Sequence, residues 1–278
     1  MPVDAAGAGG TTHAADGEPS VRRIVSLAPS NTEIAHFLGL TDRVVGVCND
    51  SDFPAELQGA ARVGMDLNID ADAVAALSPD LVLASLSVPG MERCVEAVKS
   101  RGLPTLTLDP KRLEDVFRDI RLVGRAAGVP GRAEALNASL QRRLAAVESA
   151  VMGPPRPRVW WEWWPRPLIS PGSRSWMVDI VHIAGGELIF GDVDRESFTV
   201  EEERVLLQDP EVAVLCWCGT LQRKQDPAKL MARPGWAGVR AVAERRVFAV
   251  DEALFGRPGP RLVEGAELLA KVFHPRAA

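Results

Sequence analysis

Four of the seven tryptophans of this chain lie within five positions, in the stretch Val159–Pro167, and the chain has no tyrosine. Indole rings bury a large apolar area and also stack on flat ligands at a low entropic cost. Alternate side chains of a strand face opposite sides, and a strand covered by helices buries both faces. We therefore expect Trp160 and Trp161 to be core residues. Trp163 and Trp164 follow at the end of the strand, where exposed indoles predict one wall of a binding site.

Glu162 lies among these indoles and is the one charged residue of the cluster. A carboxylate that is buried without a partner carries a large desolvation cost. We therefore expect an ion pair between Glu162 and Arg158, Arg166 or Arg174. The other interpretation is that the carboxylate contacts a ligand directly.

The sequence contains no motif of a known catalytic site: no nucleophile elbow, phosphate-binding loop, zinc-protease helix or dinucleotide fingerprint. Ser30, Asn31 and Glu33 resemble a reactive cluster, but the spacing of Ser30 and Glu33 is that of a helix capping box. The four histidines are scattered and predict no metal site. Cys216 and Cys218 lie in an apolar run, where two buried, inert thiols are expected. These patterns predict a binding protein rather than an enzyme.

Composition limits the class of partner. The 278 residues are 46% hydrophobic and 25% charged with a net charge of −5, which is typical of a globular protein and not of a nucleic-acid binder. No apolar run is long enough to predict a transmembrane helix. Residues 1–20 have neither a basic start nor an apolar segment, so they predict a flexible leader rather than a secretory signal.

The elements that must position these residues alternate between short apolar runs and helical patterns, which is typical of parallel α/β architecture. The pattern starts twice, because the segments after Arg23 and after Arg158 are alike and Pro79 and Pro210 hold corresponding places. Between them, Pro130–Met152 predicts one long amphipathic helix. We therefore expect a ligand cleft between two Rossmann-like α/β lobes. The predicted divisions are a leader (1–20), an N-terminal α/β lobe (21–129), a bridging helix (130–153) and a C-terminal α/β lobe (154–278).

Several long segments carry a resemblance to a known family: "RIVSLAPSNTEIAHFLGL", "VVGVCNDSDFP", "PLISPGSRSWMVDIVHIAGGELIFGD" and "LFGRPGPRLVEGAELLA". The chain resembles the solute-binding proteins of ABC importers that carry cobalamin, haem or ferric siderophores, and among them the cobalamin binders most closely. The resemblance covers Arg23–Phe273. It implies two α/β lobes bridged by a rigid helix, with the corrin ring lying flat in the cleft between aromatic side chains.

The resemblance also implies which residues contact the ligand. In the first lobe, Asp50 stands where an aromatic residue is expected, and Met65 stands near the place of an expected tryptophan. In the second lobe, Phe198 replaces a further tryptophan. The complete set of expected ligand contacts is Pro29, Ser30, Asn31, Asp50, Phe53, Met65, Trp163, Trp164, Arg166, Phe198, Asp251, Phe255 and Arg257.

Family members dock on a membrane permease through one acidic residue of each lobe, and the corresponding residues are Asp72 and Glu203. The alternative interpretation is that these acids only favour the dipole of the helix whose first turn they occupy. The resemblance further implies a monomer outside the cytoplasm, with cobalamin as ligand and no catalytic cofactor. Two alternatives stay open. A rim of arginines (Arg166, Arg174, Arg223 and Arg257) would suit haem or a ferric siderophore, and the absence of a signal sequence would suit a cytoplasmic corrinoid-handling or regulatory protein.

Overall fold

The computed structural model describes residues 21–275, so the predicted leader at 1–20 lies outside the described residues. The first half of the chain forms a five-stranded sheet with the order β3-β2-β1-β6-β7 and parallel pairing throughout. All residues of β1 and β6 are buried, which explains why both are apolar except for a serine at the end of each strand. The strands are β1 (Ile24–Ser26), β2 (Val44–Val47), β3 (Ala61–Arg62), β6 (Leu81–Ser85) and β7 (Thr105–Leu108), with a separate hairpin of β4 (Gly64–Met65) and β5 (Asn68–Ile69).

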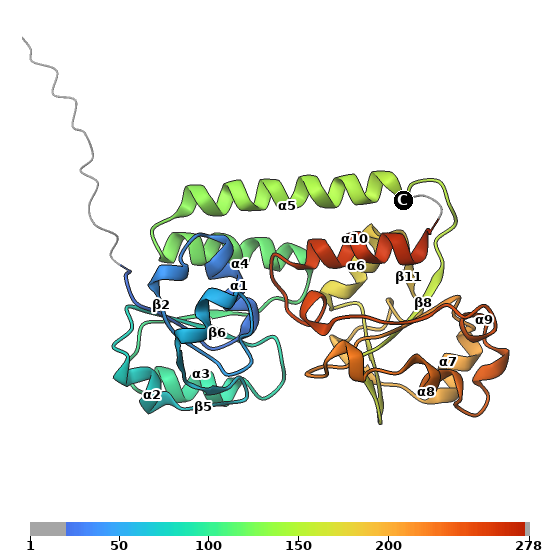
Figure 1. The fold of residues 1–278 in the computed structure, drawn as a ribbon, viewed down its shortest axis with the longest axis horizontal. Coiled ribbons are helices and arrows are strands. Elements are labelled where there is room, and N and C mark those ends of the chain that lie inside the picture. Colours follow the sequence, from blue (N-terminus) through green and yellow to red (C-terminus); the bar gives the residue numbers. More distant parts are fainter. Residues whose placement is uncertain (1–20, 276–278) are drawn as a thin grey trace, which may run out of the picture.

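Four helices flank this sheet and complete the first lobe (Figure 1). They are α1 (Pro29–Phe37), α2 (Ala71–Ala76), α3 (Glu92–Lys99) and α4 (Leu113–Ala126). The expected end of α1 is confirmed, because Gly39 follows the helix with a φ of +68°, the left-handed conformation that glycine adopts readily. The expected capping box is wrong. The helix begins at Pro29, Ala28 is its N-cap, and no side chain caps it, so Ser30 and Glu33 both lie within the helix.

The second half forms a four-stranded parallel sheet with the order β11-β8-β13-β14 and a three-stranded antiparallel sheet with the order β12-β10-β9. Its strands are β8 (Arg158–Glu162), β9 (Trp164–Pro165), β10 (Leu168–Pro171), β11 (Glu187–Leu188), β12 (Ser197–Thr199), β13 (Val212–Leu215) and β14 (Val247–Ala249). Its helices are α6 (Trp176–Ile183), α7 (Glu202–Gln208), α8 (Pro227–Met231), α9 (Arg240–Ala243) and α10 (Leu262–Phe273).

The repeat predicted from the sequence extends to individual hydrogen bonds. In the first lobe, the Asp80 amide donates to the Arg23 carbonyl, and the Arg23 amide donates to the Asp80 carboxylate. In the second lobe, Glu211 and Arg158 make the same two bonds. Each pair joins the start of one strand (β1 or β8) to the turn before its parallel neighbour (β6 or β13). The two lobes therefore share the same arrangement.

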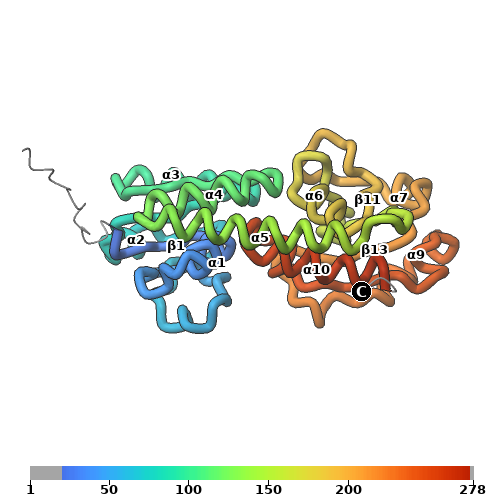
Figure 2. Tube along the Cα trace, turned by 90° about the horizontal axis from the view of Figure 1, so that it is seen from above, coloured from blue at the N-terminus to red at the C-terminus, as the bar shows by residue number. Residues whose placement is uncertain are grey.

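The helix α5 (Pro130–Ala150) runs along both lobes and connects them (Figures 1 and 2). Pro130 occupies its first turn, where the missing amide hydrogen costs nothing. Leu140, Leu144 and Val147 are buried on one side of the helix, which packs on α4 in the first lobe and on α6 and α10 in the second. This is the two-lobe α/β fold with a bridging helix that the sequence predicts. No helix within residues 21–275 is long and apolar enough to span a membrane.

Candidate ligand-binding cleft

A cavity of about 700 Å³ lies between the two lobes, which is within the size range of small-molecule sites. The first lobe contributes Ser87, Val88, Pro89 and Lys111, from the loops that follow β6 and β7. The second lobe contributes the larger share of the wall, including three tryptophans. Another cavity, of about 570 Å³, is lined by second-lobe residues alone. We take the cavity between the lobes as the candidate site because both halves of the repeat build it.

The strand β8 and the hairpin that follows it divide the tryptophan cluster. Trp160 and Trp161 are fully buried on opposite faces of β8, as expected. Trp163 lines the cavity but is only 7% exposed, because its ring packs edge-on against Trp161 at 5.5 Å. Trp164 also lines the cavity and is 39% exposed. One segment therefore supplies both core and cavity wall, and Trp164 is the more accessible indole.

Trp176 is a third cavity-lining indole, which the sequence analysis did not single out. It occupies the first position of α6, after the N-cap Ser175. Its Nε1 donates a hydrogen bond of 2.7 Å to the carbonyl of Phe255, which fixes the ring at the wall. The position of Trp176 in the sequence could have identified it as a cavity residue, because it directly follows a loop that the repeat places after a strand.

The cationic side chains of the cavity are largely neutralised within the protein. Lys111 Nζ lies 2.9 Å from carboxylate oxygens of both Asp109 and Glu196. Arg174 Nε lies 3.2 Å from Asp194 Oδ1. The Lys111–Glu196 pair joins the two lobes, since Glu196 belongs to the second. The third cation, Arg195, is exposed and donates to the backbone carbonyl of Asp194. The wall thus offers aromatic area, two paired cations and one guanidinium that has no ion pair within residues 21–275.

Glu162 is buried and paired as expected, but its partner is Arg233 rather than Arg158, Arg166 or Arg174. Both terminal nitrogens of Arg233 donate to the Glu162 carboxylate, at 2.6 and 2.8 Å. The Nε1 of Trp217 donates a third bond of 3.0 Å. This carboxylate is therefore satisfied inside the second lobe, and it is not a ligand contact.

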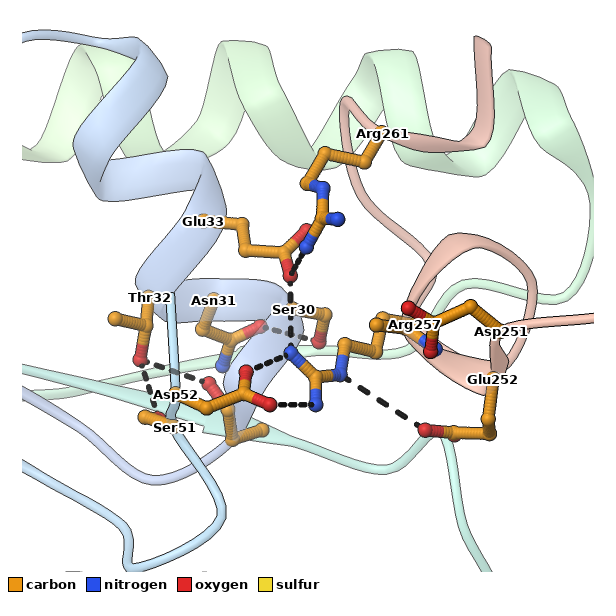
Figure 3. Close-up of polar contacts among 12 residues, drawn as sticks. Ser30, Asn31, Thr32, Glu33, Ser51, Asp52, Asp251, Glu252, Arg257 and Arg261 are labelled. Carbon is orange, nitrogen blue, oxygen red and sulfur yellow. Dashed lines mark hydrogen bonds and ion pairs between the residues drawn. The ribbon is translucent and has the colours of Figure 1, made fainter. Parts of the chain in front are cut away.

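Beside the cavity, a charged cluster connects the lobes through Arg257 (Figure 3). Arg257 Nη1 lies 2.5 Å from Asp52 Oδ1 and 3.2 Å from Glu33 Oε1. Arg261 Nη1 lies 3.3 Å from the same Glu33 oxygen, and Arg257 Nε lies 4.0 Å from Glu252 Oε2. Glu33 and Asp52 belong to the first lobe, whereas the other members belong to the second. We call these five residues the Arg257 cluster.

The cluster shifts the ionisation of its members. Burial raises the pKa of Glu33 to about 7, and the guanidinium groups of Arg257 and Arg261 offset part of that rise. Burial acts to raise the pKa of Asp52 as well, but Arg257 outweighs it and the pKa of Asp52 is lowered. The Asp52 carboxylate in turn helps to raise the pKa of Arg257, against the effect of burial. The Arg257–Asp52 pair is therefore charged at neutral pH, with Glu33 as its titratable neighbour.

Several expected ligand contacts lie away from the cavity. The resemblance implied that Phe255 contacts the ligand. Its ring is instead fully buried against Trp161, with ring centroids 5.1 Å apart. Phe198 contacts Phe190, while its neighbour Ser197 lines the cavity, which follows from the alternation of strand side chains. Arg257 is occupied by the cluster described above. Phe255, Phe198 and Arg257 are therefore outside the cavity lining.

The other expected contacts are distributed around the first lobe and the outer loops. Ser30 and Asn31 are buried within α1 and Pro29 is half-buried. Asp50 accepts a hydrogen bond from the Asp66 amide, and Phe53 lies under the Arg261 guanidinium. The remaining three are exposed and outside the cavity lining: Met65, Arg166 and Asp251.

Two cysteines were expected to be buried, and only one is. Cys216, which directly follows β13, is buried, whereas Cys218 is exposed and lines the cavity. The strand ends at Leu215, so strand alternation does not extend to Cys218. Within residues 21–275, no group of three or more histidine, cysteine, aspartate or glutamate side chains is arranged to hold a metal ion.

The two acids expected to dock on a permease occupy corresponding helices. Asp72 lies in the first turn of α2 and Glu203 in the first turn of α7. Both are exposed. Asp72 Oδ1 accepts a bond of 2.7 Å from Arg101 Nε. The two helices lie in different lobes, on the side of the molecule away from α5 (Figure 1).

Comparison with known proteins places this geometry in context. A family model described as periplasmic binding protein matches residues 24–254. An uncharacterised ABC transporter substrate-binding lipoprotein of Bacillus subtilis is 31% identical over 263 residues, covering 91% of this chain and 80% of the relative. A vitamin B12-binding protein of Vibrio parahaemolyticus is 28% identical over 243 residues, covering 87% of this chain and 85% of the relative.

A solved structure shows the same fold. The periplasmic heme-binding protein of Roseiflexus sp. RS-1, in its apo form, superimposes with a TM-score of 0.80 at 25% identity. The match covers 93% of this chain and 100% of the other. The expected fold class is thus confirmed, and the similar proteins include both a vitamin B12 binder and a heme binder.

Proposed function

The chain belongs to the periplasmic binding protein family, and from this premise we propose that it binds a corrinoid such as cobalamin between its lobes and delivers it to an ABC importer. Its relatives are substrate-binding proteins of ABC transporters, and it is such a protein rather than an enzyme. The observation that carries the proposal is the composition of the cavity wall. Three indoles from one lobe face a cavity in which two of the three cationic side chains, Lys111 and Arg174, are paired with acids of the protein.

The wall suits a small molecule whose metal ion needs no coordinating side chain from the protein. Protein-bound haem iron takes an axial ligand from histidine, cysteine, methionine or tyrosine. Among the described residues that line the cavity, Cys218 is the only one of these types. Cobalamin carries axial ligands of its own, so stacking surfaces and hydrogen-bonding groups are enough to hold it.

The charge of the wall points in the same direction. A ferric catecholate siderophore or the haem propionates bring negative charges, for which free guanidinium groups are the best partners. Arg174 and Lys111 are already paired with acids of the protein, which leaves Arg195 as the one cavity cation without an ion pair among the described residues. The similarity to a vitamin B12-binding protein over 87% of the chain supports the same ligand.

Delivery to a permease is the second part of the proposal. Asp72 and Glu203 project from equivalent helices of the two lobes and would contact basic residues of a membrane permease. The lipoprotein relative supports a location outside the cytoplasm. The protein would act as a monomer, since one chain builds both walls of the cavity.

Titration with cyanocobalamin tests the ligand. Binding should quench tryptophan fluorescence, because Trp164 and Trp176 would contact the corrin. Trp164→Ala should weaken binding about tenfold or more, as expected for the loss of one aromatic contact of 1.5 kcal/mol or above. Arg166→Ala, two residues away at the tip of the hairpin, is the matched control and should bind normally. The absence of both quenching and calorimetric heat at tens of micromolar ligand would exclude a corrinoid.

Haem is the second candidate, because Cys218 reaches the cavity and a heme-binding protein shares the fold. Hemin added to the protein would then give a sharp Soret band that Cys218→Ser shifts or removes. A ferric hydroxamate in the same panel tests the siderophore alternative. Fractionation of the native host tests the cytoplasmic alternative, which requires the protein to remain with the soluble cytoplasmic fraction.

A further inference from the structure

Arg257 is the centre of a cluster that links three separated segments. It follows Gly256, which lines the cavity, and it reaches Asp52 in the loop after β2 and Glu33 in α1. The guanidinium also lies near Glu252, in the turn that precedes it. Figure 3 shows the guanidinium lying among these three carboxylates. A guanidinium, with five donors on a planar fork, can serve several partners at once.

The centre of the cluster is more buried than the other ion pairs between the lobes, although its Asp52 side chain is 65% exposed. The Arg257 side chain is 12% exposed and the Glu33 side chain is fully buried. By contrast, both members of the Lys111–Glu196 pair are substantially exposed, as is Arg112 in its pair with Asp179. Exposed pairs are screened by water and salt and contribute little. A buried pair is held rigidly, because separating it would leave an unpaired charge in the interior.

The cluster is connected to the cavity wall through the polypeptide chain at Gly256. Gly256 packs so closely on the Glu252 carboxylate that a Cβ at this position would overlap it. The next residue along the chain is Arg257, which does not line the cavity itself. Any movement of Arg257 relative to Asp52 would therefore move the wall at Gly256 relative to the first lobe.

The position of α5 makes this contact important. The bridging helix lies on one side of the molecule, packed on α4 in one lobe and α10 in the other (Figure 1). The lobes also pack directly on each other through α4 and α6. The spacing of the cavity walls depends in addition on the ion pairs between the lobes, and among these the Arg257–Glu33 pair is more buried than Lys111–Glu196 or Arg112–Asp179.

We propose that Arg257 is a positioning residue, which sets the spacing of the two cavity walls by holding Asp52 and Glu33 of the first lobe against the Glu252 turn of the second. Its consequence for affinity rests on the proposed function. Its consequence for lobe spacing does not, because the ion pairs between the lobes form without a ligand.

Distance measurement between spin labels on the ligand-free protein tests the proposal. Labels at Glu96→Cys in α3 and Lys229→Cys in α8, in a Cys218→Ser background, report the spacing of the lobes, since the other cysteines are buried. Arg257→Met should shift the distance distribution to longer values and broaden it. Arg257→Lys should restore only part of the change, because a compact ammonium group keeps the charge but lacks the bidentate fork that contacts Asp52.

Two further variants keep the test decisive. Arg240→Met removes ion pairs with Asp209 and Glu211, which lie wholly within the second lobe, and should leave the distribution unchanged. Asp52→Asn alters an exposed partner of Arg257, so it should fold even if Arg257→Met does not, and it should reproduce the shift in part. A distribution that is the same in the parent, Arg257→Met and Asp52→Asn would overturn the proposal.

Affinity gives a second and separable measurement. If the parent binds cyanocobalamin, Arg257→Met should weaken binding about tenfold, within the usual range for coupling through structure. Unchanged affinity together with shifted spacing would contradict the link between the cluster and the cavity. If the parent binds no corrinoid, the proposed ligand is wrong, while the spacing measurement still decides the role of Arg257.

Discussion

Trp163 and Trp164 are neighbours with different structural roles. Trp163 is nearly buried and packs on Trp161, whereas Trp164 leaves over a third of its surface exposed to the cavity. Trp163→Ala should therefore lower the free energy of unfolding by about 3 kcal/mol, as is usual for a large core side chain. Trp164→Ala should cost less than about 1 kcal/mol. Urea unfolding measures both values, and equal losses would show that the two indoles share one environment.

The sequence alone placed both Trp163 and Trp164 on the wall of a binding site. The structure changes that expectation, because a ring with 7% exposure contributes to the core as well as to the wall. Trp164→Ala is the variant that separates binding from stability.

Glu33 should make stability depend on pH in a defined window. Its pKa is raised from 4.5 to about 7 in the folded protein, mainly by burial. Between these values the folded state binds the proton more tightly than the unfolded chain does. Stability should therefore fall as pH rises from about 4.5 to about 7, by on the order of 1–3 kcal/mol from this group.

The neutral isostere isolates that contribution. Glu33→Gln removes the titration, so its unfolding free energy should fall less than the parent's over the same pH range. Glu267→Gln, which alters a partly exposed ion pair with Arg143, serves as the control and should follow the parent. Parallel pH profiles for the parent and Glu33→Gln would show that Glu33 keeps an ordinary pKa.

Residue roles that depend on distant partners were the least predictable from the sequence. The spacing of Ser30 and Glu33 predicted a capping box, but the nearest partners of Glu33 are Arg257 and Arg261, more than two hundred positions away. Glu162 was correctly expected to be paired, because its apolar neighbours in the sequence predict burial and a buried carboxylate needs a partner. Its partner Arg233 could not be identified, because the loop that carries it has no pattern linking it to β8.

At the level of elements, the sequence predicted far more, because the relevant forces act over short distances. Apolar runs identified β1 and β6, glycine ended α1 as expected, and the repeated segments correspond to equivalent hydrogen bonds in both lobes. Phe198 and Phe255 were expected to contact a ligand, but their rings contact Phe190 and Trp161. A one-residue change of face is invisible when the ends of a short strand or turn are not known.

The contact between α4 and α5 gives a prediction about two glycines. A Cβ on Gly124 of α4 would lie 2.5 Å from the Cβ of Ala133 on α5. Gly124→Ala should therefore destabilise the protein by about 1–3 kcal/mol from overpacking, despite alanine's higher helix propensity. Gly131 of α5 has open space around it, so Gly131→Ala should stabilise by up to about 1 kcal/mol. Equal effects in thermal or urea unfolding would mean that the two helices are not in close contact.

The arrangement of the whole molecule leaves one side available to a partner. The bridging helix α5 covers one side, and α2 and α7 lie on the other, one in each lobe (Figure 1). A partner that contacts both lobes at once gains from two linked sites, because the second contact forms within the complex. The sequence predicted this symmetry from the repeat. It did not reveal that Asp72 is already paired with Arg101, whereas Glu203 has no ion-pair partner within residues 21–275.

That difference makes the two lobes unequal in the proposed docking. Glu203→Lys should reduce ligand transport through the cognate permease about tenfold or more, because it sets like charges against each other. Asp72→Lys should have a smaller effect, since the Asp72 charge is already balanced by Arg101, and the double variant should lose the most. Ligand affinity should be unchanged in all three. Glu134→Lys, the same charge change on exposed α5, is the control and should transport normally. A transport rate that does not respond to either acid would show that docking uses another surface.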